Sequence, residues 1–109
     1  MSPTQRSLAY LRKEGYVCQV VERWNPFAHC RQDLFNFIDI VCIKEGEMGV
    51  LGVQTTSTAN MSARIKKIND LVVSTTWLTT GNHIWVIGWS KKGARGKVKK
   101  WTPTIKVID

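Results

Sequence analysis

Two neighbouring runs of β-branched and apolar residues constrain the fold of this chain more than any other feature of its sequence. Residues 37–43 (FIDIVCI) and 48–56 (MGVLGVQTT) each have the length of a strand, and the turn-like segment Glu45-Gly46-Glu47 separates them. Short β-branched runs bounded by turn residues are typical of buried strands. The sequence therefore predicts that the two runs pair as a hairpin inside a sheet.

The segments on either side of this hairpin predict helices and further strands. Ser2-Pro3-Thr4 is typical of a helix start and Gly15 of a helix stop, while residues 61–79 show apolar positions at helical spacing before Gly81. In chain order we expect a helix at 4–14, a strand at 16–24, a loop or irregular strand at 26–35, strands at 37–43 and 48–56, a helix at 61–79, a strand at 83–89, a cationic turn or loop at 91–100 and an edge strand at 101–107. In 109 residues this order predicts a single α/β domain, residues 1–109, with a central mixed sheet.

The charge of the chain favours a polyanionic partner. Sixteen Lys and Arg residues against eight acids give a net charge of +8. Cations that meet phosphates release condensed counterions, so such an excess predicts nucleic-acid binding. Two clusters are candidates for phosphate contact: Lys91, Lys92, Arg95, Lys97, Lys99 and Lys100 in the segment 91–100, and Arg64, Lys66 and Lys67 in the predicted helix 61–79. The second cluster could instead be a solvated helix face. The whole chain could instead be a basic protein without a polyanionic partner, or it could bind a membrane surface. No basic amphipathic helix accompanies the first cluster, so we expect no membrane partner.

The cysteines and the apolar segments bear on the compartment. Three cysteines without a CxxC pair argue against a disulfide framework and against a zinc site, and predict reduced, mostly buried thiols. The chain shows no apolar leader and no apolar run of membrane-spanning length. We therefore expect the cytoplasm, or a nucleoid or viral replication site within it.

One acid lies inside the first apolar run. Burying the carboxylate of Asp39 among Ile and Val is costly unless a partner compensates its charge, and a metal ion is one such partner. Gln54 and Thr56 lie two residues apart in the next predicted strand and therefore share a face. If the strands pair, Gln54 stands near Asp39, and a carboxylate with an amide oxygen can hold Mg²⁺. The alternative for Asp39 is a buried carboxylate satisfied by backbone amides or by Arg31.

Two nearby features also have two interpretations. Asp33 is a candidate second ligand, but its place beside Arg31 favours a surface salt bridge or a turn cap. The hydroxyl-rich segment 54–58 is either a polar strand end with a helix cap or a contact for metal or phosphate.

Together, these elements and motifs resemble the PD-(D/E)XK nuclease superfamily, and within it small Holliday junction resolvase-like enzymes. The resemblance covers residues 4–89 and rests on Phe37-Ile38-Asp39-Ile40 and on Gly52-Val53-Gln54-Thr55-Thr56-Ser57, which a basic helix follows. It implies a restriction-endonuclease-like core of a helix, three strands, a helix and a strand, to which this chain adds a last strand. It also implies hydrolysis of phosphodiester bonds with Mg²⁺ or Mn²⁺, DNA as the substrate and a homodimer.

The resemblance assigns roles to particular residues, with departures. Asp39 takes the place of the metal-binding Asp of the second strand, and Gln54 that of the metal-binding Glu of the third. Thr56 stands where the family has the Lys that positions or activates water, so a cation of the following helix would have to supply that charge. The family often adds an acid from the first helix, where this chain has Gln5, and Glu22 is the expected replacement as a metal ligand.

Three functions are consistent with these features. The first is a metal-dependent nuclease, with Asp39, Gln54 and Thr56 as the catalytic set. The second is a non-catalytic nucleic-acid-binding module on the same fold, which the missing Lys favours. The third is a viral or mobile-element accessory protein that binds another protein.

Overall fold

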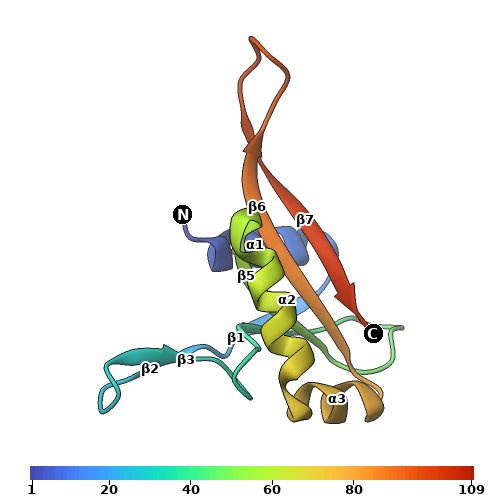
Figure 1. Cartoon of the computed structure of the whole chain (residues 1–109). Coiled ribbons are helices and arrows are strands. Elements are labelled where there is room, and N and C mark those ends of the chain that lie inside the picture. The colour runs from blue at the N-terminus through green and yellow to red at the C-terminus, as the bar shows by residue number, and fades with distance from the viewer.

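The computed structural model describes all 109 residues and confirms an α/β domain built on a mixed five-stranded sheet (Figure 1). The strands lie in the order β1, β4, β5, β6 and β7, with bounds Val17–Val20, Ile40–Ile43, Leu51–Ser57, His83–Lys92 and Lys100–Ile108. Only β5 and β6 run parallel, and the other neighbours are antiparallel. The hairpin predicted from the two apolar runs is the antiparallel pair β4–β5, and the predicted last strand is β7 at the sheet edge.

Helices cover both faces of the sheet. Helix α1 (Pro3–Lys13) packs on one face, and its start is capped as expected, since the backbone N–H of Gln5 donates to Ser2 Oγ over 3.2 Å. Helices α2 (Met61–Asp70) and α3 (Val72–Thr79) cover the other face. The core is therefore double, with Leu11, Ile40, Cys42, Leu51, Val53, Ile87 and Trp89 on the α1 side, and Phe37, Ile38, Met61, Ile68, Ile84, Val86 and Ile108 on the α2 side. No helix is long and apolar enough to cross a membrane.

The predicted single helix over 61–79 is wrong, because the crossover from β5 to β6 contains a break. A short 3₁₀ turn, η1 (Thr58–Asn60), leads into α2, and Leu71 then adopts an extended conformation between α2 and α3. The hydroxyl of Ser74 lies 2.7 Å from the carbonyl oxygen of Ile68 and 2.8 Å from that of Leu71. It thus satisfies carbonyls that lose their helical partners at the end of α2.

The predicted strand over 16–24 is also wrong, because it divides in two. The chain leaves the sheet after β1, and β2 (Arg23–Asn25) pairs with β3 (Cys30–Gln32) in a separate hairpin that projects from the body (Figure 1). Asn25 closes the tip, since its side-chain oxygen accepts from two backbone amides. The expectation of mostly buried thiols fails here, since Cys30 is exposed.

The strand predicted over 37–43 begins later, at the start of β4. Residues 34–38 form a tight turn closed by the backbone bonds from Phe37 and Ile38 to the carbonyl of Leu34. Ile40 is opposite Val53 in β5, and the amide of Asp39 donates to the carbonyl of Val53 over 2.8 Å. Asp39 therefore lies where β4 begins, across from the middle of β5.

The turn or loop predicted over 91–100 is confirmed for residues 93–99, which connect β6 to β7. The paired strands reach slightly further than expected, since Lys92 is still opposite Lys100. This antiparallel extension, which we call the basic ribbon (residues 91–100), projects from the body of the domain (Figure 1).

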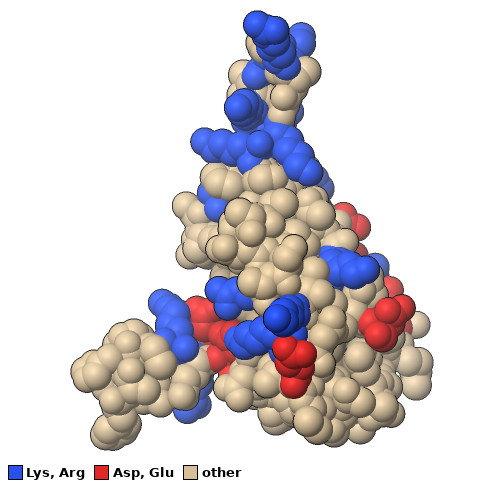
Figure 2. Space-filling view, viewed as in Figure 1, with Lys and Arg blue, Asp and Glu red and all other residues tan.

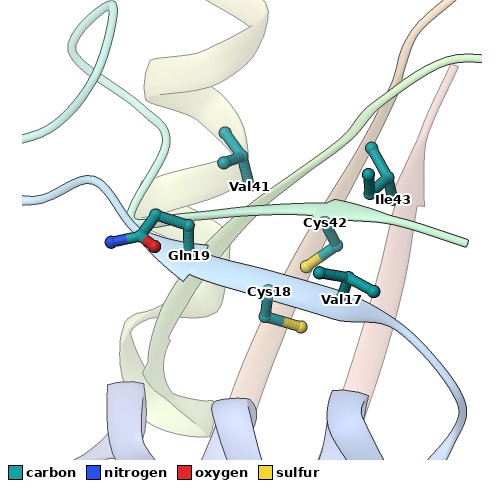
Figure 3. A pocket seen from close by; sticks show the side chains of 6 residues that line it. All are labelled: Val17, Cys18, Gln19, Val41, Cys42 and Ile43. Atoms are coloured by element: carbon teal, nitrogen blue, oxygen red, sulfur yellow. The ribbon is translucent and has the colours of Figure 1, made fainter.

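A shallow apolar hollow of about 200 Å³ lies on the α2 side of β1 and β4, where no helix covers the sheet (Figure 3). Among its six lining residues, Val17 and Ile43 are half or more exposed, and Cys18 lies opposite Cys42. Burial raises the pKa of the Cys42 thiol well above its usual range. Five of the six residues that line the hollow are hydrophobic, so it is a poor candidate for chemistry.

Candidate functional site

A polar cleft of about 320 Å³ opens beside the start of β4, between the β2–β3 hairpin and α2. No hydrophobic residue lines it. We call it the acidic cleft, and its lining residues are Glu22, Arg31, Asp33, Asp39, Gln54, Thr55, Arg64 and Lys67. Figure 2 shows acids flanked on both sides by cations in this region. The arrangement offers oxygen donors and positive charge in one place.

The pair predicted from the two strands is present in the cleft. Asp39 is 3% exposed and Gln54 is 2% exposed, and Gln54 Nε2 donates to Asp39 Oδ2 over 2.9 Å. The backbone N–H of Thr55 donates to the same oxygen over 2.8 Å. One part of the alternative interpretation of Asp39 therefore also holds, since a backbone amide does satisfy it. Arg31 does not serve Asp39, because its guanidinium pairs with Glu22 over 3.0 Å.

Two further carboxylates join Asp39. Oxygen atoms of Glu22, Asp33 and Asp39 all lie within 4.8 Å of one another. Glu22 reaches this point because the chain turns out of the sheet directly after β1. Asp33 reaches it because the turn after β3 folds back through two residues with positive φ, Phe35 at 53° and Asn36 at 68°.

The salt bridge favoured for Asp33 from the sequence is present, but its partner is not the neighbouring Arg31. Its partner is Lys67 of α2, with Nζ 4.0 Å from Oδ2, and Arg31 pairs elsewhere. Gln54 Nε2 also lies 3.4 Å from Asp33 Oδ2, so the amide of Gln54 bridges two carboxylates. No pattern in the sequence predicts this bridge, because the positive φ angles of Phe35 and Asn36 occur without a glycine.

The electrostatics of the cleft leave one carboxylate without a cationic partner. Glu22 pairs with Arg31, and Asp33 with Lys67, but Asp39 has only neutral donors. Burial, and then the neighbouring Asp33, raise the pKa of Asp39 to about 8, although the N–H of Thr55 acts in the opposite direction. Ionised Asp39 therefore needs additional positive charge beside it.

A hard divalent cation fits this set of donors. Three carboxylates and an amide are the ligands that Mg²⁺ and Mn²⁺ prefer. Gln54 Oε1 is buried and accepts no hydrogen bond. Rotating the amide by half a turn exchanges its oxygen and nitrogen, which would give a cation an oxygen ligand and relieve the orphaned acceptor. The predicted metal ligands Asp39, Gln54 and Glu22 thus lie together, with Asp33 as a fourth candidate.

The other predicted site residues are distributed unevenly. Arg64 and Lys67 line the cleft from α2, whereas Lys66 is exposed and does not line it. Thr56 is buried and lies outside the lining, opposite Gly88 of β6. The six cations of the basic ribbon also lie outside the cleft.

Sequence reasoning missed a backbone contribution. Alternation places the side chain of Thr55 on the α1 face, where its Oγ1 lies 3.1 Å from Thr4 Oγ1, while its backbone N–H serves Asp39. Patterns of side chains do not reveal such a donor. Gln5, the residue at the position of the family's helix acid, lines an adjoining cavity of about 390 Å³ together with Glu22 and Arg31.

Comparison of the chain with models of known protein families, with curated proteins and with solved structures finds no match. The acidic cleft itself therefore carries the functional argument. Its oxygen ligands can hold a divalent cation, and its Arg and Lys side chains can hold a phosphate next to that cation.

Proposed function

We propose that this protein is a metal-dependent nuclease that hydrolyses phosphodiester bonds of DNA at the acidic cleft. The observation that carries the proposal is the meeting of Asp39, Asp33, Glu22 and Gln54 in one polar cavity whose α2 wall holds Arg64 and Lys67. Divalent cation and phosphate are the two ligands that this combination suits best, and a nuclease needs both side by side.

The order of elements supports the same proposal. The resemblance to the PD-(D/E)XK type implies a restriction-endonuclease-like core, and its order of elements corresponds here to α1, β1, β4, β5, α2 and β6. The β2–β3 hairpin, α3 and β7 would be additions to that core. In that comparison Asp39 begins the second core strand, and Gln54 lies in the middle of the third. A metal centre at this point of the sheet is what the resemblance implies.

The residues of the cleft would have different roles in hydrolysis. A bound Mg²⁺ or Mn²⁺ would lower the pKa of a water molecule and stabilise negative charge on phosphate oxygens. Asp39 and Gln54 would hold the cation from two neighbouring strands, with Glu22 and Asp33 completing the set. Lys67, already beside Asp33, would donate to the scissile phosphate or to the attacking water. It would thereby replace the charge that Thr56 cannot supply.

A second candidate function follows from Thr56. Because a buried threonine occupies the position of the family's catalytic Lys, the same fold could bind nucleic acid without cutting it. The cleft would then be a phosphate or metal site of structural importance only.

The deciding experiment is a cleavage assay with a matched pair of variants. The purified protein is incubated with branched, duplex and single-stranded DNA in Mg²⁺, Mn²⁺ or EDTA. We expect metal-dependent cutting that falls by about 100-fold or more in Asp39→Asn, since a ligand is lost. Asp70→Asn changes an exposed acid at the end of α2 outside the cleft and should cut like the unmodified protein.

Each other outcome has a defined meaning. Salt-sensitive binding without cutting in any metal would overturn the nuclease and support the binding module. Equal cutting by Asp39→Asn and the unmodified protein would remove the acidic cleft from the reaction. Absence of binding at low salt would discard both functions.

A further inference from the structure

The basic ribbon is a second, separate feature that the acidic cleft does not use. At its base Lys91 is opposite Trp101 and Lys92 is opposite Lys100, and residues 93–99 connect the two strands. The ribbon has six cations and no acid. Figure 2 shows cations gathered along this projection, well separated from the acids of the molecule.

At the paired base of the ribbon, cations lie on both faces. Side chains alternate along a strand, so Lys91 and Trp101 point to the α1 side and Lys92 and Lys100 to the α2 side. On the α1 side the guanidinium of Arg6 stacks 3.7 Å from the centroid of the Trp101 ring, and Lys91 Nζ lies 5.4 Å from it. This stacking braces the base of the ribbon against α1. A ribbon with charge on both faces suits a position between two walls of phosphate.

The shape of the ribbon suits a groove of defined width. Its base is two paired strands wide, and the connection over residues 93–99 contains the small residues Gly93, Ala94 and Gly96. The major groove of B-form DNA is about 12 Å wide and admits a two-stranded ribbon. The major groove of an RNA duplex is too narrow for side chains to enter. The ribbon therefore matches DNA and not RNA.

The ribbon and the acidic cleft lie toward the same end of the sheet. Because β5 and β6 are parallel, Gln54 lies opposite Val86, and the chain then runs six residues further to Lys92. At about 3.3 Å per residue this places the paired base of the ribbon about 20 Å beyond Gln54. One turn of B-form DNA spans about 34 Å, so a single duplex can meet both features.

We propose that the basic ribbon docks in the major groove of duplex DNA, within one helical turn of the phosphate that the acidic cleft holds. This inference rests on the proposed function, because it takes the cleft and the ribbon to act on the same molecule. The phosphates on the two walls of the groove pair with the cations on the two faces of the ribbon. The nuclease is thereby directed to double-stranded DNA.

The test measures binding in EDTA, so that cutting plays no part. The probe is a labelled DNA duplex of about three helical turns. Lys97→Gln combined with Lys99→Gln removes two ribbon cations, and we expect binding to weaken at least tenfold, with a salt slope smaller by about two. The control combines Arg12→Gln with Lys44→Gln, which removes the same charge at the opposite end of the sheet. It should change binding less than threefold.

Groove choice is tested with modified probes. Glucosylated hydroxymethylcytosine fills the major groove and should weaken binding of the unmodified protein, whereas a minor-groove ligand such as netropsin should not compete. An RNA duplex of the same sequence should bind at least tenfold more weakly. Equal binding by the ribbon variant and its control, tighter binding to the RNA duplex, or competition by netropsin alone would each overturn the inference.

The cleavage assay separates this inference from the proposed function. If ribbon-dependent DNA binding is found but no metal supports cutting, the ribbon inference stands on its own and the nuclease proposal fails. If the protein cuts DNA but the ribbon variant binds and cuts like the control, the nuclease stands and the ribbon inference fails. Circular dichroism of the ribbon variant should match that of the unmodified protein, because all the changed side chains are exposed.

Discussion

Gln54 Nε2 lies 2.9 Å from Oδ2 of Asp39, so a neutral amide occupies the place beside a buried carboxylate. In the resemblance to PD-(D/E)XK nucleases an acid stands at that position. The amide satisfies Asp39 without adding charge, whereas a second carboxylate would repel it. An amide at this position therefore stabilises the metal-free fold, and in the proposed metal site it would add less charge for a cation than a carboxylate.

Gln54→Glu tests this relation directly. We expect the affinity for Mn²⁺ to rise about tenfold, because ligand charge tunes the affinity for divalent cations. We also expect the melting temperature in EDTA to fall, since two buried carboxylates then face one another. Titration calorimetry and thermal melts measure the two effects. Gln54→Met removes the oxygen at similar volume and should lower Mn²⁺ affinity, and a rise in affinity with this control would contradict the role of Gln54 as a ligand.

The stability of the metal-free protein should depend on pH through Asp39. The pKa of Asp39 is about 8 in the folded protein against an ordinary value of 3.8, so between these values the folded state binds more protons than the unfolded state. The contribution of protonated Asp39 to the free energy of unfolding is then fully present below about pH 4 and is lost as the pH rises toward 8. Asp39→Asn cannot ionise and should melt about 5 °C or more above the unmodified protein at pH 8, with little difference at pH 4.

Thermal melts in EDTA between pH 4 and pH 8 measure this difference in melting temperature between Asp39→Asn and the unmodified protein. Melts with added Mn²⁺ test whether a cation compensates the charge of Asp39. Added Mn²⁺ should raise the melting temperature of the unmodified protein at pH 8, because it binds only the folded state. The same addition should leave Asp39→Asn nearly unchanged. A melting curve of Asp39→Asn with the same pH dependence as the unmodified protein would show that another group titrates.

The sequence was sufficient for the central hairpin and for the meeting of Asp39 with Gln54. Both follow from local properties, namely β-branched runs of strand length and the alternation of side chains along paired strands. The register that brings the two together is fixed by the same apolar pattern, because a slip by one residue would turn every side chain to the other face. This part of the fold and of the site was therefore predictable.

The remaining features depend on tertiary contacts that no local pattern encodes. Asp33 enters the cleft only because Phe35 and Asn36 adopt positive φ, which neither residue type requires. The break at Leu71 depends on the hydroxyl of Ser74, which could equally have pointed to solvent in one continuous helix. An apolar run also does not distinguish a buried turn from a strand, so the strand predicted over 37–43 includes residues 37–39, which precede β4.

Lys67 and Lys66 offer a matched comparison on α2. Both are exposed lysines of the same helix, but only Lys67 lines the cleft, with Nζ 4.0 Å from Asp33 Oδ2. If the proposed function holds, Lys67→Met should lower the cutting rate by about 100-fold, as the loss of a donor to developing charge does in hydrolytic enzymes. Lys66→Met should change it less than threefold. The measurement is single-turnover cleavage at saturating protein, and equal losses in the two variants would reduce both lysines to general phosphate contacts.

Gly88 links the sheet to the helix that carries these cations. A Cβ at this position would clash with the side chain of Met61 and lie 3.1 Å from the Cα of Thr58, so Gly88→Ala must displace the side chain of Met61, which begins α2, and shift η1 slightly away from β6. Overpacking of this kind costs about 1–3 kcal/mol of stability. Because α2 carries Arg64 and Lys67, we expect cutting to fall by more than the loss of folded protein explains.

Met61→Ala in the same chain makes room for the added methyl, so the two changes together should destabilise less than the sum of their separate effects. Denaturant unfolding and single-turnover cleavage of the four proteins measure this coupling, and simple additivity would mean that the contact between Met61 and β6 does not position the cations of α2.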